Sequence, residues 1–176
     1  PHYTLKYDEL LNDPEIDVIG IYTPDKFHAA HVKAALSHGK HVVCTKPFID
    51  DLAEAKPIID LVKSTGKKVF VGQSSRFFEP MRRQRKDYEE GLIGELITVE
   101  AYYHADHRWF LAKGWAKTDA FKWLYGGLSH PVDLLRWYLP DIEEVSGYSG
   151  LSENGKKLVL VHADTFHFIF KSAGGK

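Results

Sequence analysis

The sequence is poor in cysteine, because Cys44 is the single one among its 176 residues. One thiol excludes an intramolecular disulfide and a zinc site built from several thiolates, and such rarity is typical of a reducing compartment. No apolar run approaches the roughly 20 residues that a membrane-spanning helix needs. The opening residues, PHYTLKYDELL, also lack the charged-then-apolar layout of a signal peptide. These absences predict a cytoplasmic protein with no membrane partner.

An excess of charge of one sign is absent too. The 23 Lys and Arg residues nearly balance the 24 Asp and Glu residues, for a net charge of −1. No global field therefore attracts nucleic acid, and we expect no nucleic-acid partner. With 44% hydrophobic and 27% charged residues, the composition is that of a globular protein and excludes a disordered tail, a collagen-like fibre and a coiled coil.

A glycine-rich nucleotide loop is also missing, since none of the 14 glycines forms G-x-G-x-x-G. Residues 150–156 resemble a phosphate-binding loop in spacing, but Lys157 stands where Ser or Thr should hold magnesium. A phosphate loop must also open onto a helix N-terminus, and the sequence here predicts a strand instead. We interpret S-E-N-G, residues 152–155, as a hairpin turn.

The first 75 residues alternate between strand and helix patterns. Short apolar runs predict strands at residues 17–23, 41–45 and 68–73, and amphipathic segments predict helices at 25–39 and 50–66. This order predicts parallel βαβ units with helices on both faces of the sheet. We place the domain boundary between residues 75 and 76.

The second half has a different pattern. It predicts a charged helix ending near Gly91, an alternating strand at residues 96–104, a Trp- and His-rich loop, and a helix at 130–139. Two further strands, at 143–150 and 156–170, would join through the S-E-N-G turn. Helices on one face of an antiparallel sheet indicate an α+β domain. The fold class is therefore α/β, followed by this α+β domain.

Two prolines mark the ends of the first two predicted strands, in Thr23-Pro24 and Thr45-Lys46-Pro47. Open α/β sheets bind ligands along this edge. Lys46 is therefore expected to project into a crevice, where a desolvated ammonium polarises a carbonyl or hydroxyl oxygen. The alternative is a lysine in a solvent-facing loop.

His130 follows Gly126-Gly127 and begins the last predicted helix. Histidine is the side chain best suited to take and return a proton near neutral pH, although a histidine here equally suits a capping or packing role. Asp133 shares its helix face and either orients His130, contacts a ligand or interacts with the helix dipole. His104, Asp106 and His107 do not share one strand face, so we expect no metal site.

These motifs together resemble the Gfo/Idh/MocA family of NAD(P)-dependent oxidoreductases. The resemblance rests on D-P-E-I-D-V-I-G-I-Y-T-P with a histidine four residues later, on A-L-S-H-G-K-H-V, and on G-G-L-S-H-P-V-D-L-L-R-W. It implies the second part of a Rossmann domain, residues 1–75, and part of a substrate-binding domain, residues 76–176, with a mostly antiparallel open sheet. It implies that the glycine-rich loop and the end of the sheet lie outside this sequence.

The resemblance also implies functional residues. Lys46 and His130 correspond to the catalytic lysine and histidine. Thr23, Pro24, His28, Lys46 and Gln73 correspond to cofactor-binding positions, and Arg76 and Asp133 to substrate-binding ones. Trp109, in the loop before His130, is our further candidate for substrate contact.

The resemblance implies NAD or NADP as cofactor, a sugar- or polyol-like substrate, and a homo-oligomer, dimer or tetramer, formed through the C-terminal sheet. Hydride transfer is the expected activity. Redox-assisted glycoside cleavage and a non-catalytic binding role are the alternatives.

The sequence departs from the family at two positions. Thr45 replaces the usual glutamate before the lysine, and Gly126 replaces an aspartate that forms a pair with the histidine in many members. Another carboxylate, from Asp133, Asp106 or Asp119, would have to support His130, unless the substrate differs or activity is weak.

Overall fold

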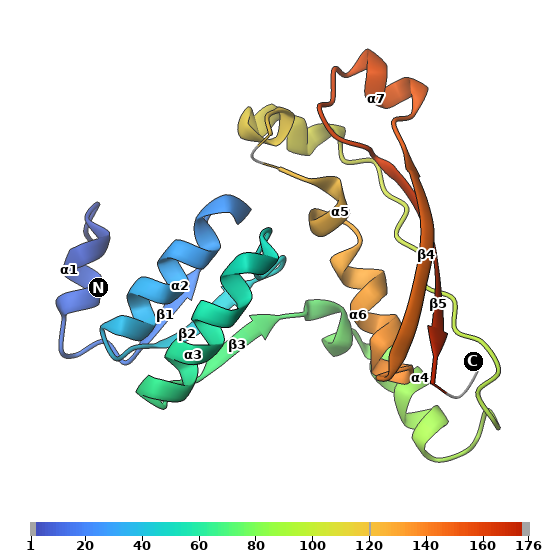
Figure 1. Cartoon of the computed structure of the whole chain (residues 1–176), viewed down its shortest axis with the longest axis horizontal. Coiled ribbons are helices and arrows are strands. Elements are labelled where there is room, and N and C mark those ends of the chain that lie inside the picture. Colours follow the sequence, from blue (N-terminus) through green and yellow to red (C-terminus); the bar gives the residue numbers. More distant parts are fainter. Residues whose placement is uncertain (1–2, 120, 174–176) are drawn as a thin grey trace. The chain divides into compact units, whose positions relative to one another are not determined.

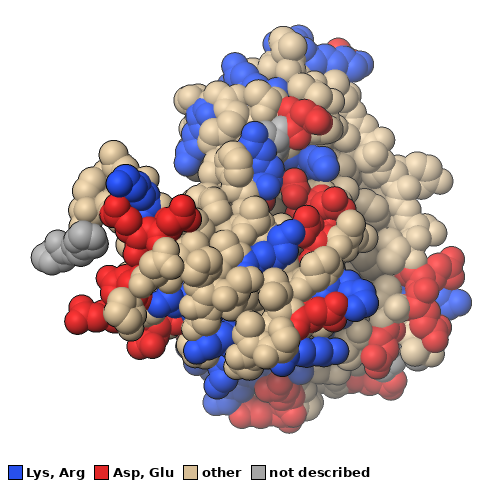
Figure 2. Space-filling view, turned by 60° about the vertical axis from the view of Figure 1, so that its left-hand side comes forward, with Lys and Arg blue, Asp and Glu red and all other residues tan. Residues whose placement is uncertain are grey.

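The structure is a computed structural model that describes residues 3–119 and 121–173. The chain forms two compact units, residues 1–72 and 73–176, so the division falls three residues before the expected boundary. Figure 1 shows the helices and strands of the chain in sequence colours. Acidic and basic side chains intermingle on the face drawn in Figure 2.

The first unit is a three-stranded parallel sheet in the order β1-β2-β3. Its strands are β1 (Val18–Ile21), β2 (His41–Thr45) and β3 (Val69–Gly72), which confirms the three predicted strands. Its α-helices are α1 (Tyr7–Asn12), α2 (His28–Ser37) and α3 (Ala55–Thr65). A short 3₁₀ turn precedes each of the last two, η1 (Asp25–Phe27) and η2 (Leu52–Glu54).

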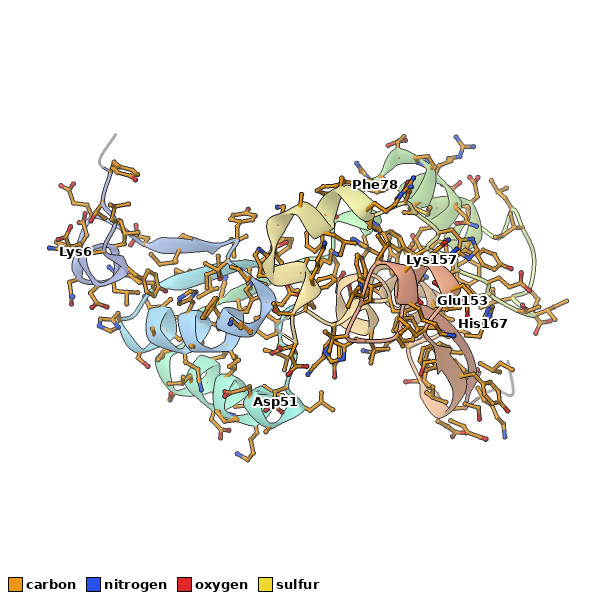
Figure 3. The ribbon with its side chains drawn as sticks, turned by 90° about the horizontal axis from the view of Figure 1, so that it is seen from above. Lys6, Asp51, Phe78, Glu153, Lys157 and His167 are labelled. Carbon is orange, nitrogen blue, oxygen red and sulfur yellow. The ribbon has the colours of Figure 1, made fainter. Side chains whose placement is uncertain are left out.

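Local chemistry explains where these helices begin and end. The Asp51 side chain, labelled in Figure 3, accepts a hydrogen bond of 2.9 Å from the Ala53 amide and so caps η2. Pro57 lies in the first turn of α3, where its missing amide hydrogen has no cost. Gly66 ends α3 with a φ of +66°, a left-handed conformation that glycine adopts without strain.

One expectation about this unit is wrong: among the described residues, the sheet is covered on one face only. The burial of β1 alternates, with Ile19 and Ile21 buried and Val18 half exposed. Because the strand order is sequential and βαβ crossovers are right-handed, α2 and α3 fall on the same face. The core lies between that face and the helices, around Val32, Leu36 and Cys44.

The second unit pairs two antiparallel strands, β4 (Ile142–Gly150) and β5 (Thr165–Ser172). Its α-helices are α4 (Glu79–Glu89), α5 (Trp123–Gly126), α6 (Ser129–Tyr138) and α7 (Glu153–Lys157). Its 3₁₀ segments are η3 (Ser74–Phe77), η4 (Arg108–Lys113) and η5 (Trp115–Lys117). The predicted strand at 143–150 and the helix at 130–139 are confirmed.

The predicted hairpin turn at S-E-N-G is wrong, because these residues begin α7 (Figure 3). Ser152 caps that helix by accepting from the Gly155 amide at 3.0 Å, and its own amide and hydroxyl donate to the Asp164 carboxylate at 2.8 and 2.6 Å. The strand predicted at 156–170 consequently shortens to β5. The hydrogen bonds from Ser152 to Asp164, twelve residues later, stabilise the start of a helix here instead of a hairpin turn.

The strand predicted at residues 96–104 is also wrong, since within the described ranges this segment joins no ladder. Alternation in a sequence shows which side chains share a face, but a strand also needs a partner whose backbone groups are available. Here β4 and β5 pair with one another.

None of the helices in the described part of the chain is long and apolar enough to cross a membrane.

Candidate functional site

In the first unit, the candidate residues lie where β1 and β2 end. β2 ends at Thr45, and Lys46 begins the loop that follows, with a cis peptide bond to Pro47. Burial lowers the pKa of Lys46, and the nearby charge of Asp25 acts in the opposite direction. A partly desolvated ammonium at this edge is a strong hydrogen-bond donor for an oxygen that gains negative charge.

Asp25 is a member of this group that the sequence reasoning missed. Burial raises the pKa of the Asp25 carboxyl, while the charges of His28 and Lys46 lower it. The only sequence signal was its place directly after Thr23-Pro24 at the end of a strand. Asp25 therefore places a half-buried carboxyl close to the candidate lysine.

His28 lies beneath the two loops rather than on their surface, since its side chain has 0% exposure. Its Nδ1 is 2.7 Å from the Pro47 carbonyl oxygen, and its Nε2 is 2.8 Å from the Thr23 carbonyl oxygen. The ring thus connects the loop after β1 with the loop after β2. The buried ring therefore exposes no surface to a ligand, and what it does in the structure is hold these two loops together.

In the second unit, the candidate histidine is held by a serine that the sequence reasoning did not select. The Ser75 Oγ lies 2.9 Å from the His130 Nδ1, and Ser75 is buried at 8% exposure. The Tyr103 ring lies beside the same imidazole, with a centroid separation of 5.3 Å. Ser75 is in η3 and His130 is in the first turn of α6, so the contact joins two segments 55 residues apart.

The next residue of η3 makes a second contact with α6. The Arg76 Nε donates to the Asp133 Oδ2 at 2.6 Å, and its Nη2 donates to the Oδ1 at 2.8 Å. Residues three apart on a helix share a face, so Ser75 and Arg76 contact the same side of α6. Two planar groups joined at two points are a rigid arrangement.

The other carboxylates considered as supports for His130 are engaged elsewhere. Asp106 accepts hydrogen bonds from Arg108, and these lower its pKa to about 2. Asp119 lies 2.8 Å from the His162 Nε2, although their geometry does not form a hydrogen bond.

The surroundings of Gly126 leave no room for a side chain at this position. A Cβ built on it would lie 2.3 Å from the Phe121 Cζ. Phe121 is itself buried, in an aromatic cluster with Phe110, Trp115 and Trp123. The Phe121 ring therefore fills the space that a side chain at position 126 would need.

Gln73 and Trp109 differ in their surroundings. The Gln73 Oε1 is buried and, among the described residues, makes no hydrogen bond. An amide oxygen in this state is an acceptor ready for a donor such as a carboxamide. Trp109 is 64% exposed and its ring packs against His107 and Phe110, with no ring contact to His130 among those described.

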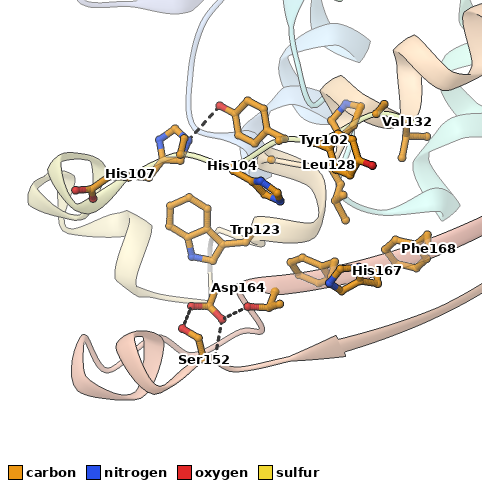
Figure 4. Close-up of a pocket in the computed structure, with 18 of the residues that line it drawn as sticks. Tyr102, His104, His107, Trp123, Leu128, Val132, Ser152, Asp164, His167 and Phe168 are labelled. Atoms are coloured by element: carbon orange, nitrogen blue, oxygen red, sulfur yellow. Dashed lines mark hydrogen bonds between the residues drawn. The ribbon is translucent and has the colours of Figure 1, made fainter. Parts of the chain in front are cut away.

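A cavity of about 1070 Å³ lies in the second unit between residues 99–108, α5, α6 and β5. The cavity is lined in part by Tyr103, whose ring lies beside His130. Four of the candidate site residues do not line it: His130, Arg76, Asp133 and Trp109. In Figure 4, the dashed contacts between Asp164 and Ser152 mark one end of this cavity. The described residues hold no group of three or more His, Cys, Asp or Glu side chains arranged for a metal ion.

Comparison with known proteins places this geometry in context. Residues 2–73 match the model of GFO_IDH_MocA, the oxidoreductase family with an NAD-binding Rossmann fold. The uncharacterized oxidoreductase YhhX of Escherichia coli (strain K12) is 37% identical over 102 residues, which cover 58% of this chain and 30% of that protein. The chain spans well under half the length of the curated relatives it matches.

Two solved structures show the same fold. The myo-inositol 2-dehydrogenase of Lactobacillus plantarum matches with a TM-score of 0.86 at 22% identity, over 98% of this chain and 52% of that one. The scyllo-inositol dehydrogenase of Lactobacillus casei, solved with NAD(H) and scyllo-inositol, matches with a TM-score of 0.81 at 20% identity, over 97% and 51%.

Proposed function

We propose that the chain belongs to the Gfo/Idh/MocA oxidoreductase family, whose model matches residues 2–73, and that its protein is an NAD(P)-dependent dehydrogenase acting on a sugar or cyclic polyol. The observation that carries this proposal is that a histidine at the start of α6, His130, is held by a hydrogen-bond contact with Ser75. A general base must be held in a fixed orientation, and the Ser75 Oγ lies 2.9 Å from the His130 Nδ1. The inositol dehydrogenases that share the fold support the polyol substrate class.

The residues of the first unit fit a nicotinamide nucleotide. Thr23, Pro24 and Lys46 lie at the carboxyl edge of a parallel sheet, where such ligands bind. In the second unit, the Gln73 Oε1, which makes no hydrogen bond with any residue the structure describes, is an acceptor suited to a carboxamide group. Assays with both NAD and NADP decide between the two cofactors.

The proposed chemistry divides between the cofactor and the chain. When bound, the nicotinamide supplies the acceptor for the hydride that leaves the carbon of the reacting hydroxyl. His130 takes the hydroxyl proton at Nε2 as the carbonyl forms. In the first unit, the proposed role of the partly desolvated Lys46 Nζ is to donate a hydrogen bond to a ligand oxygen that gains negative charge. Arg76 and Asp133, which fix one another, are the proposed contacts for substrate hydroxyls.

The test uses the protein in its full natural length. It is assayed with NAD⁺ and NADP⁺ against myo-inositol, scyllo-inositol and glucose, by the absorbance of the reduced cofactor. His130→Ala is expected to lower kcat at least ~100-fold, because loss of a general base costs 10²–10⁴-fold. Near-normal turnover by that variant contradicts the assignment. Product release without net reduction of the cofactor supports glycosidase-type chemistry instead, and cofactor binding without turnover supports a non-catalytic role.

We also propose that the protein is a homo-oligomer that assembles through β4 and β5. Tyr148 and Ile169 lie on one face of this two-stranded sheet and are 86% and 77% exposed. Burial of such side chains between copies is favourable. Light scattering is expected to show a dimer or tetramer that Ile169→Asp weakens, and a monomeric wild type contradicts the proposal.

A further inference from the structure

Position 126, where the resemblance leads one to expect an aspartate paired with His130, is a glycine, and the Ser75 hydroxyl contacts the His130 Nδ1. We propose that Ser75 is the positioning residue for His130, with its hydroxyl oxygen accepting a hydrogen bond from the His130 Nδ1–H. This inference rests on the proposed function, because it gives the mechanism by which His130 is kept ready as a base.

The first argument is the geometry of the contact. The separation of 2.9 Å between Oγ and Nδ1 is a normal hydrogen-bond length. Ser75 is buried, so water competes weakly for its hydroxyl. A hydroxyl can either donate to Nδ1 or accept from Nδ1–H, and the proposal commits to the second arrangement. In that tautomer Nδ1 carries the ring proton and Nε2 is the basic nitrogen.

The second argument is that the nearby candidate carboxylates contact other side chains and do not orient His130. Asp133 is bound at two points by Arg76, Asp106 is bound by Arg108, and Asp119 faces His162. Position 126 admits no side chain while the Phe121 ring stays in place, because a Cβ there would be 2.3 Å from it. The structure thus assigns the orienting contact to a neutral hydroxyl.

The third argument is the rigidity of the element that carries Ser75. The 3₁₀ segment η3 directly follows β3 in the chain, and its next residue, Arg76, is attached to α6 by two charged hydrogen bonds. These bonds fix η3 against the helix that bears His130. The serine hydroxyl is therefore presented to the imidazole from a fixed backbone, as a positioning residue requires.

A neutral hydroxyl has a chemical consequence. A carboxylate both orients an imidazole and stabilises the imidazolium that forms when the base takes a proton. A serine orients the ring but adds no negative charge, so most of its contribution is the choice of tautomer. Removing it is expected to lower the rate while leaving substrate affinity intact.

The kinetic test compares Ser75→Ala with Ser75→Thr and with Ser74→Ala. Ser74 is the exposed neighbour in the same segment and serves as the matched control. In the full-length protein, with NAD⁺ and the polyol that gives turnover, Ser75→Ala is expected to lower kcat about tenfold and to change KM less than twofold. Ser75→Thr keeps the hydroxyl and is expected to retain most of kcat, and Ser74→Ala is expected to match the wild type.

A spectroscopic test needs no turnover. In full-length protein labelled with ¹⁵N-histidine, the NMR resonances of His130 are expected to show a protonated Nδ1 and a bare Nε2, and Ser75→Ala is expected to populate the other tautomer. His130→Ala identifies the resonances. An unchanged tautomer in Ser75→Ala, or an unchanged kcat, overturns the inference. If His130→Ala retains turnover, the proposed function fails, and the tautomer measurement still decides whether Ser75 orients the ring.

Discussion

Arg76 and Asp133 bind one another at two points, with the Arg76 Nε 2.6 Å from one carboxylate oxygen and its Nη2 2.8 Å from the other. Both residues were expected to contact substrate, and the structure joins them first to each other. Their pair attaches η3 to α6, and η3 carries the serine that contacts His130. Arg76 and Asp133, which were expected to bind substrate, thus also hold η3 against the helix that carries His130.

The ion pair gives a prediction for stability. Arg76→Lys keeps the charge but loses the two-point geometry, and we expect it to lower the free energy of unfolding by about 2 kcal/mol, because hydrogen bonds to charged groups contribute about 1.5–3 kcal/mol. Arg83→Lys is the matched control, because Arg83 and Asp87 form an exposed pair on α4. Urea unfolding is expected to show a change below about 0.5 kcal/mol for that control. Equal effects of the two substitutions contradict the prediction.

The close approach of Phe121 to Gly126 predicts the effect of adding one methyl group. Gly126→Ala is expected to lower the unfolding free energy by about 1–3 kcal/mol, since its Cβ would lie 2.3 Å from the ring. Gly150→Ala is the control, because nothing lies within 4 Å of a Cβ at that position.

The double variant Gly126→Ala with Phe121→Leu tests the cause. The smaller side chain makes room for the methyl group, so this variant is expected to lose less stability than the two single changes added together. Strict additivity would show that the ring is not what excludes a side chain at position 126.

Cys44 gives a prediction about chemical reactivity. It is fully buried in β2, and burial, together with the charge of Asp25, raises the pKa of its thiol to about 12. At pH 8 the thiolate fraction is then on the order of one in ten thousand. Native protein is expected to resist iodoacetamide, and protein in concentrated urea to take one label at Cys44, measured by mass spectrometry. Rapid labelling of the native protein at Cys44 would contradict the burial described here.

Asp164 gives a prediction about pH. Burial raises the pKa of Asp164, but hydrogen bonds from the side chain and amide of Ser152 and from Thr165 lower it, and the net effect is a lowered pKa. A carboxylate with a lowered pKa stabilises the fold above its unfolded value of about 3.9, and that contribution is lost as pH falls through the folded value.

The corresponding variant is Asp164→Asn. At pH 7 it is expected to be about 1 kcal/mol less stable than the wild type, and the difference is expected to shrink as pH falls below about 4. The control is Glu153→Gln at an exposed position of α7, which is expected to show no such pH dependence. A difference that stays constant from pH 7 to pH 3 contradicts the role of the ionised carboxylate. Urea unfolding at each pH measures it.

The sequence was sufficient where structure depends on local patterns. The three strands of the first unit follow from short apolar runs ended by Thr-Pro, Thr-Lys-Pro and Gly-Gln, and α6 follows from the spacing of its apolar residues. It failed where structure depends on distant partners. Asn154-Gly155 predicts a hairpin, but Asp164 holds Ser152 as a helix cap; residues 96–104 alternate, but join no strand among the described residues.

For the site, the sequence by itself determined which residues have suitable chemistry: a lysine after β2, a histidine at the start of α6, and a glycine four residues before that histidine. Only the tertiary structure decided what surrounds them. It placed Ser75 on the His130 Nδ1, set the Phe121 ring against Gly126, and buried His28 under two loops. The reason is physical: hydrogen bonds and burial join residues up to 55 positions apart, and the local sequence around each residue does not specify such partners.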